Sequence, residues 1–209
     1  MKQLYLLLLL LTTSVLFAQN WEKDTIKLNE VLILNKKYTI KTYKFWSVCS
    51  LVDGFDSTVT EMVTLVDQLP EGYVESVSFK FNRPDENSHH TTRETEYQDS
   101  EMEMVFYEAK PNNTPGERIK HERKIFTVSK DLSGKMKIDV SDLNIKSSGR
   151  IFIGLKRLTS NIKLKRREFY VDCLCNKEKF ISYRCYSNGK WQSSRTYALK
   201  MIVKVRVYK

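Results

Sequence analysis

Apolar side chains recur at every second position in segment after segment of this chain, and that rhythm restricts the possible fold more than any other feature. Leu199, Met201, Val203, Val205 and Val207 alternate with mostly charged residues, and only Ile202 interrupts the pattern. Successive side chains of a β-strand point to opposite faces, so such a segment places one face in a core and one in water. Because similar segments recur from end to end, we predict an all-β, antiparallel β-sandwich, jelly-roll-like, of about ten strands.

Three further segments carry the pattern clearly. The first, 73–81, would place Tyr73 on the same face as Val77, Phe79 and Phe81, and the second, 134–140, ends at a predicted turn over 141–143. The third, 150–158, has apolar residues on both faces, which is typical of a central strand covered on both sides. Weaker strand predictions cover residues 27–34, 39–45, 59–66, 102–107, 119–128 and 169–175.

Turn residues divide these segments. The pair Asn188-Gly189 suits a tight hairpin turn, so strands over 180–186 and from Trp191 onward should be antiparallel neighbours. The polar stretch 82–101 and the proline-containing stretch 110–116 are predicted to be loops.

The N-terminus has the features of an export signal. Lys2 precedes an apolar run from Leu4 to Leu11, and the small residue Ala18 stands at a plausible cleavage point. Crossing a bilayer takes about 20 apolar residues, so this run is short for an anchor. We predict a signal peptide over 1–19, an extended lead-in over 20–36 and the sandwich over 37–209. The mature chain would then be exported to the periplasm, the outer-membrane surface or the medium, with no transmembrane segment after leader removal.

Several segments together resemble the C-terminal β-sandwich of carboxypeptidase-like regulatory-domain proteins, a family of exported Bacteroidetes proteins. The resemblance is carried by Asp24–Ile33, Val74–Phe79, Val105–Tyr107, Met136–Val140, Ile151–Leu155 and Asn188–Trp191. It departs from the family in lacking a regulatory-like domain before Leu28–Val31 and in the length of the charged loop over 82–101. The resemblance implies a sandwich at the cell envelope with no established chemistry.

The chain is basic, with 35 Lys and Arg against 25 Asp and Glu and a net charge of +10. The local excess is strongest around Lys163, Lys165, Arg166 and Arg167, which are candidate anion-binding residues. A basic excess suits nucleic acid, anionic lipid or acidic glycan, and export makes nucleic acid the least plausible of these. The alternative is a solvated loop between two strands.

Four cysteines follow the leader: Cys49, Cys173, Cys175 and Cys185. An even number in an exported chain favours disulfides. Cys173 and Cys175 would share one face of a strand, so we expect Cys49 to bond one of the late cysteines and the remaining two to bond each other. A four-thiolate zinc site and buried free thiols are the alternatives.

Signals for catalysis are weak. Nucleophile-elbow, phosphate-cradle and zinc-hydrolase motifs are missing from the sequence. The acidic run over 93–103 (Glu94, Glu96, Asp99, Glu101 and Glu103) could bind calcium or form a charged edge or loop. Aromatic residues that could stack on sugars, although packing is the expected role of most, are Trp46, Trp191, Tyr183, Tyr186 and Tyr197.

From these observations we expect an exported, non-catalytic binding or scaffolding protein of the cell envelope, with no cofactor. Its partner would be an envelope protein or a surface glycan. One alternative is a polysaccharide-acting enzyme or carbohydrate-binding module, and a cleft with two convergent carboxylates would favour the enzyme. The other alternative is adhesion to anionic glycan through the basic segment.

Overall fold

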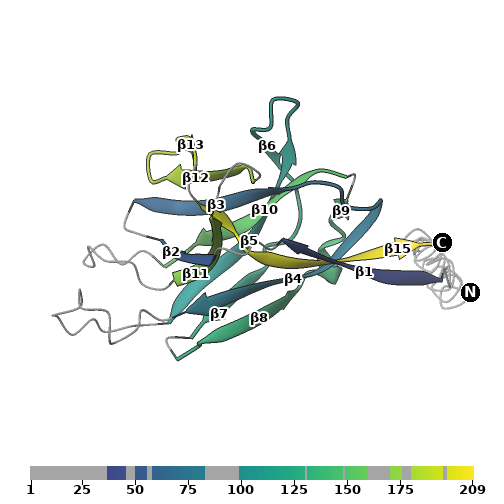
Figure 1. Cartoon of the computed structure of the whole chain (residues 1–209), viewed down its shortest axis with the longest axis horizontal. Helices are drawn as coiled ribbons and strands as arrows, with labels where there is room; N and C mark the ends of the chain where they lie inside the picture. The colour runs from purple at the N-terminus through teal and green to yellow at the C-terminus, as the bar shows by residue number, and fades with distance from the viewer. Residues whose placement is uncertain are drawn as a thin grey trace, which may run out of the picture. The chain divides into compact units, whose positions relative to one another are not determined.

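Two antiparallel β-sheets pack against each other in the computed structural model, which describes residues 37–45, 50–55, 58–82, 99–129, 131–147, 149–159, 170–175, 180–194 and 197–209 (Figure 1). The eight-stranded sheet has the order β1 (Tyr38–Phe45), β15 (Met201–Tyr208), β4 (Gly72–Asn82), β11 (Tyr170–Cys175) and β14 (Tyr197–Leu199). Off this path, β2 (Ser50–Gly54) pairs with β11, whereas β8 (Gly134–Asp139) and β9 (Lys146–Ser147) pair with β4. The seven-stranded sheet has the order β13 (Trp191–Ser193), β12 (Ser182–Tyr186), β3 (Val59–Val66), β10 (Ile151–Arg157), β5 (Ser100–Ala109) and β6 (Pro115–Arg118), and β7 (Ile125–Val128) pairs with β5. The predicted all-β sandwich is confirmed.

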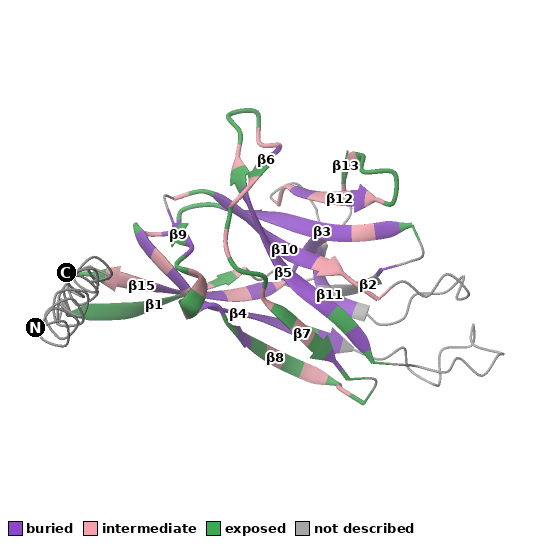
Figure 2. Cartoon of the chain, turned by 180° about the vertical axis from the view of Figure 1, so that it is seen from behind, coloured by how far each residue is buried: buried purple, intermediate pink, exposed green. Residues whose placement is uncertain are grey.

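The core contains the inward-facing side chains of both sheets. Figure 2 shows that buried residues lie along strands of both sheets. The strand β10 lies between β3 and β5, and its Ile151, Ile153 and Leu155 are buried in this core. Phe152 points the other way, into a second apolar cluster on the outer side of the seven-stranded sheet. The prediction that this segment is a central strand covered on both faces is confirmed.

The predicted strand over 199–207 is divided at Lys200. Leu199 belongs to β14, which pairs with β11, whereas β15 begins at Met201 and pairs with β4. The backbone amide of Leu199 donates a buried hydrogen bond of 2.7 Å to Oγ1 of Thr64 in β3. The division therefore lets β14 bond to the opposite sheet, a long-range contact that the alternating pattern does not encode.

A β-bulge reverses one predicted side-chain direction. Val77 lies opposite Val203 and Val74 opposite Val205, so β4 has one more residue than β15 in this stretch. A bulge of this kind shifts the alternation by one residue. Val74 is therefore buried in the core, and Tyr73, which the sequence placed with Val77, lies on the other side of the sheet beside Arg206.

Other differences concern strand number and boundaries. The described residues form fifteen strand segments instead of about ten. The predicted strand over 119–128 retains only β7, and β6 begins inside a predicted loop, with Pro115 as its first residue, where proline is tolerated. The hairpin of β12 and β13 is confirmed, with Gly189 at φ 75° and Cys185 opposite Trp191. The leader, the lead-in, the strand over 27–34 and most of the loop over 82–101 lie outside the described residues.

Candidate functional site on the open face of the eight-stranded sheet

The side of the eight-stranded sheet that faces away from the core is called the open face below. Its middle strand, β4, carries small side chains there, because Ser76 and Ser78 lie between longer residues of β8 and β15. Lysines surround them: Lys44 on β1, Lys80 on β4, Lys135 and Lys137 on β8, Lys200 between β14 and β15, and Lys204 on β15. The open face is therefore basic, and the side chains of Ser76 and Ser78 on β4 are shorter than those of the neighbouring strands.

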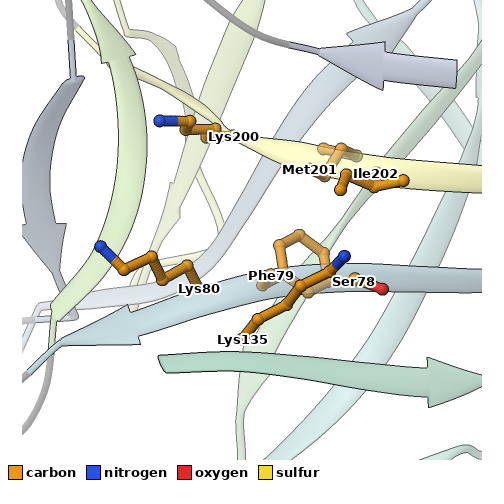
Figure 3. A pocket seen from close by; sticks show the side chains of 7 residues that line it. All are labelled: Ser78, Phe79, Lys80, Lys135, Lys200, Met201 and Ile202. Carbon is orange, nitrogen blue, oxygen red and sulfur yellow. The ribbon is translucent and has the colours of Figure 1, made fainter. Parts of the chain in front are cut away.

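A pocket opens where β4 changes its neighbour. β15 pairs with β4 as far as Phe79, and β11 takes over at Phe81, so Lys80 marks the exchange. The resulting cavity has a volume of about 260 Å³ and is named the lysine pocket (Figure 3). It is lined by Ser78, Phe79, Lys80, Lys135, Lys200, Met201 and Ile202. The apolar interruption at Ile202 is therefore part of the pocket wall.

The charges of the lysine pocket are close in the register of the sheet. Lys80 lies directly opposite Lys135 on the neighbouring strand. Like charges placed opposite each other destabilise a strand pair. Asp139 on β8 lies opposite Ser76, and hydrogen bonds from Ser141 lower its pKa. The Asp139 carboxylate thus accepts hydrogen bonds from Ser141, which follows the end of β8.

An aromatic cluster occupies the opposite end of the open face. The rings of Tyr38 and Tyr208 lie 6.2 Å apart, and those of Tyr73 and Tyr208 lie 5.9 Å apart, both edge to face. Tyr38 is 53% exposed and Tyr208 40% exposed. We call these three residues the tyrosine cluster. It draws on three neighbouring strands, because β1, β15 and β4 are adjacent in the sheet.

An ion pair lies beside the tyrosine cluster. Nε of Arg206 donates a hydrogen bond of 2.9 Å to Oε2 of Glu75, and the guanidinium carbon lies 5.6 Å from the centre of the Tyr38 ring. Partial burial acts to lower the pKa of Arg206, but the attraction of Glu75 and Tyr208 outweighs it and raises that pKa. Arg206 therefore stays charged, and exposed rings and polar groups stand side by side on a rigid sheet.

The outer side of the seven-stranded sheet carries a different row of charges. Across β12, β3, β10 and β5 the register places Cys185, Glu61, Lys156 and Glu103 opposite one another in turn. Glu61 and Glu103 are buried. Nζ of Lys156 lies 3.0 Å from Oε1 of Glu61, and the hydroxyl of Tyr107 donates to Oε2. Burial and this hydrogen bond raise the pKa of Tyr107, so it remains a donor.

Two arginines hold Glu103. Nη2 of Arg118 donates to Oε1 at 2.6 Å, while Nε and Nη2 of Arg123 donate to Oε1 and Oε2 at 3.0 and 3.1 Å. Burial by itself raises the pKa of Glu103, but the hydrogen bonds from Arg123 and Arg118 outweigh it and hold the pKa below its ordinary value. A two-carboxylate glycosidase needs one carboxyl group that stays protonated, with a raised pKa. Glu103 has the opposite property, so this row stabilises the fold and does not resemble such a pair.

The alternative that the acidic run binds calcium is not supported at Glu103, because both of its carboxylate oxygens accept hydrogen bonds from Arg118 or Arg123. Glu94 and Glu96 lie outside the described residues. Among the residues that the structure describes, no three or more His, Cys, Asp or Glu side chains are grouped so as to hold a metal ion.

The cysteines are distributed over both sheets. Cys173 is buried in the core on β11, whereas Cys185 lies in β12 of the other sheet as a buried free thiol. Cys185 therefore takes part in neither bond of the expected two-disulfide arrangement, and its neighbours in the row are Glu61 and Trp191. Burial and then Glu61 raise the pKa of the Cys185 thiol. Cys49 and the side chain of Cys175 lie outside the described part of the chain, so their pairing stays a prediction.

The basic segment with Lys163, Lys165, Arg166 and Arg167 also lies outside the described residues, and its role stays a prediction.

Most aromatic residues singled out from the sequence are packed. The Trp191 ring contacts Tyr107 edge to face at 5.3 Å, and Tyr183 contacts Phe152 at 5.8 Å. Tyr186 packs against the core, and the guanidinium of Arg184 lies over Tyr197 at 5.4 Å. Trp46 lies outside the described residues. The expectation of packing is confirmed for Trp191, and the exposed cluster consists of tyrosines that the sequence did not single out.

Comparison with known proteins supports the fold. No protein-family model matches the chain, and no curated protein matches its sequence. A crystal structure of the cysteine protease and lectin-like domains of Cwp84, a surface layer associated protein of Clostridium difficile, matches with a TM-score of 0.53 at 11% identity, covering 80% of this chain and 36% of that one. A second structure, clostridial Cwp84 after propeptide cleavage, matches with a TM-score of 0.52 at 11% identity, covering 80% and 40%. The chain thus spans well under half the length of these proteins, and the likeness is one of fold.

The resemblance to carboxypeptidase-like regulatory-domain proteins is untested by these matches and stays a prediction. In the described ranges, no helix has the length and apolar character needed to cross a membrane.

Proposed function

We propose that this chain is an exported, non-catalytic β-sandwich protein that binds glycan at the cell envelope through the open face of its eight-stranded sheet. The observation that carries the proposal is the tyrosine cluster beside the ion pair of Arg206 and Glu75. Sugar rings present apolar C–H faces and polar hydroxyls, so they suit a site with exposed aromatic rings next to charged hydrogen-bonding groups.

The placement of these residues supports binding over simple packing. Large apolar groups that gather on a surface commonly mark an interaction site, whereas single exposed ones need no explanation. Here three tyrosines gather on adjacent strands, and a sheet holds them with little loss of side-chain freedom on binding. The leader predicted over 1–19 supports export, and the fold match to a protein whose structure includes a lectin-like domain agrees with a binding role.

The test is glycan binding by the mature chain, surveyed on a glycan array and quantified by isothermal titration calorimetry. The double variant Tyr38→Ala/Tyr208→Ala removes two rings, each worth about 1 kcal/mol. We expect Kd to rise roughly thirtyfold. The matched control is Ile125→Ala, because Ile125 is 46% exposed on the other sheet.

Unchanged affinity in the tyrosine variant would remove this site from the proposal. A wild-type chain that binds no glycan on the array would remove the function itself.

A further inference from the structure

We propose that the free edge of β1 binds an extended, acidic segment of a partner protein, which adds a strand to the eight-stranded sheet. The inference goes beyond the proposed function, because the ligand is a polypeptide held by backbone hydrogen bonds and not a glycan held by side chains on the open face. Sheet edges bind extended peptides in this way, with main-chain hydrogen bonds supplying affinity and alternate side chains supplying specificity.

The edge of β1 is long and regular. β1 is the terminal strand of its sheet, and within the described ranges it pairs only with β15. The register with β15 continues from Tyr38 to Phe45 without a bulge, and β1 contains no proline. Figure 2 shows β1 as exposed along most of its length. Bulges, prolines and short strands commonly protect an edge from pairing, and β1 has none of these three features.

The unpaired backbone groups belong to identifiable residues. The amide of Lys209 donates a hydrogen bond of 3.1 Å to the carbonyl oxygen of Lys37. In an antiparallel pair, residues whose N–H and C=O groups face the partner strand alternate with residues whose groups face away. Lys37 therefore starts the series that faces β15, and the backbone groups that point outward belong to Tyr38, Ile40, Thr42 and Lys44.

Charge defines the class of partner. Lys41 and Lys44 are exposed and, three residues apart on a strand, lie on its opposite faces. Neither forms a salt bridge in the part of the chain that the structure describes. β1 and its neighbour β15 contain no Asp or Glu. A carboxylate placed opposite either lysine by an added strand gains an attraction, whereas another lysine is repelled.

The same lysines disfavour a second copy of this chain as the occupant. Two antiparallel β1 strands share the most outward backbone groups when Tyr38 of one lies opposite Lys44 of the other. That register places Lys41 opposite its own copy, and like charges directly opposite each other are destabilising. An acidic segment from another protein avoids this repulsion and gains apolar contact with Tyr38 and Ile40, which are 53% and 42% exposed.

The test uses two synthetic peptides of the length of β1, in which valine alternates with glutamate in one and with lysine in the other. Binding is measured by fluorescence anisotropy at physiological salt, and the glutamate peptide should bind about tenfold more tightly. Amide hydrogen exchange then locates the contact. The bound peptide should slow exchange at Ile40 and Thr42, and leave it unchanged at Thr39 and Lys41, whose N–H groups already bond to β15.

A backbone variant tests the edge directly. Thr42→Pro removes an outward N–H group and places the proline ring at the edge, so it should weaken binding of the glutamate peptide about tenfold or more. The matched control is Thr42→Ala, which keeps the N–H group and should bind like wild type.

A charge variant tests the choice of partner. Lys41→Gln/Lys44→Gln should weaken binding about threefold, as expected for two exposed ion pairs. The matched control, Lys120→Gln/Lys190→Gln, changes the net charge equally, because both lysines are exposed and flank β6 and β13 of the other sheet. It should leave the affinity unchanged.

Equal affinity for the two peptides, an equal loss in the Lys120→Gln/Lys190→Gln control, or unchanged exchange at Ile40 and Thr42 overturns the inference. Self-association of the wild-type chain that Thr42→Pro abolishes, measured by analytical ultracentrifugation, assigns the edge to a second copy and also overturns it. Thermal melting checks that each variant is folded. If Thr42→Pro does not fold, the exchange pattern of the wild-type chain and the lysine variants decide the question.

Discussion

The arginines that hold Glu103 provide a sharp test of how the outer side of the seven-stranded sheet is built. The Glu103 side chain is 1% exposed, whereas those of Arg118 and Arg123 are 35% and 59% exposed. Replacing both arginines by alanine leaves a buried carboxylate without a counter-charge, which costs about 3–5 kcal/mol. Replacing Glu103 by glutamine leaves two arginines that water can solvate, so the expected cost is about 1–2 kcal/mol.

The measurement is urea unfolding at pH 7, followed by tryptophan fluorescence. The expected order of stability is wild type, then Glu103→Gln, then Arg118→Ala/Arg123→Ala. Adding Glu103→Gln to the arginine double variant should restore part of the stability, because it removes the unpaired charge. This triple variant keeps the test usable if the double variant does not fold, since domain stability is only about 5–15 kcal/mol.

A loss below about 1 kcal/mol in the double arginine variant, or a triple variant no more stable than the double, would refute the reasoning. The two arginines would then not be what stabilises the buried Glu103 carboxylate in the fold.

Three further predictions follow from single residues. The folded-state pKa of Glu103 is lowered, so its ionised form stabilises the fold above the unfolded pKa of about 4.3, and this stabilisation is lost as pH falls through the lower folded value. In unfolding measured at decreasing pH, Glu103→Gln should therefore lose less stability than wild type, and equal curves would contradict this. Gly154→Ala would place a Cβ 2.0 Å from the carbonyl oxygen of Met62, so we expect thermal melting to show about 3 kcal/mol or more of destabilisation. A melting temperature equal to that of wild type would show that β3 and β10 can move apart without loss of stability. The last prediction uses a variant that keeps Cys185 as its sole cysteine. Because this thiol is buried and its pKa is raised, it should react with Ellman's reagent far more slowly in the native protein than in urea. A rapid reaction in the native protein would place the thiol at the surface.

The clearest strands predicted from the alternation of apolar residues are present in the structure. The strand over 150–158 lies at the centre of its sheet, and the hairpin around Gly189 joins neighbouring strands. Both were predictable because a period of two and a turn signal are local properties of the chain. The direction of Tyr73 was not predictable, since the bulge that reverses it exists only through the pairing of β4 with β15.

The candidate site was largely hidden from the sequence. Tyr38 and Tyr208 come from the first and last described strands, and Lys80 meets Lys135 only through the pairing of β4 with β8. The one local sign was Ile202, an apolar residue on a face expected to be polar, which proves to line the lysine pocket. An interruption of this kind marks a position but does not identify its neighbours.

By itself, the sequence determined the class of fold, the faces of its clearest strands and its net positive charge, because each depends on residue type and short-range spacing. The tertiary structure alone decided which strands became neighbours, and with them the tyrosine cluster, the lysine pocket and the pairing of buried glutamates with cations. Those features arise from hydrogen-bonded register between distant segments, and register depends on the packing of the whole sandwich.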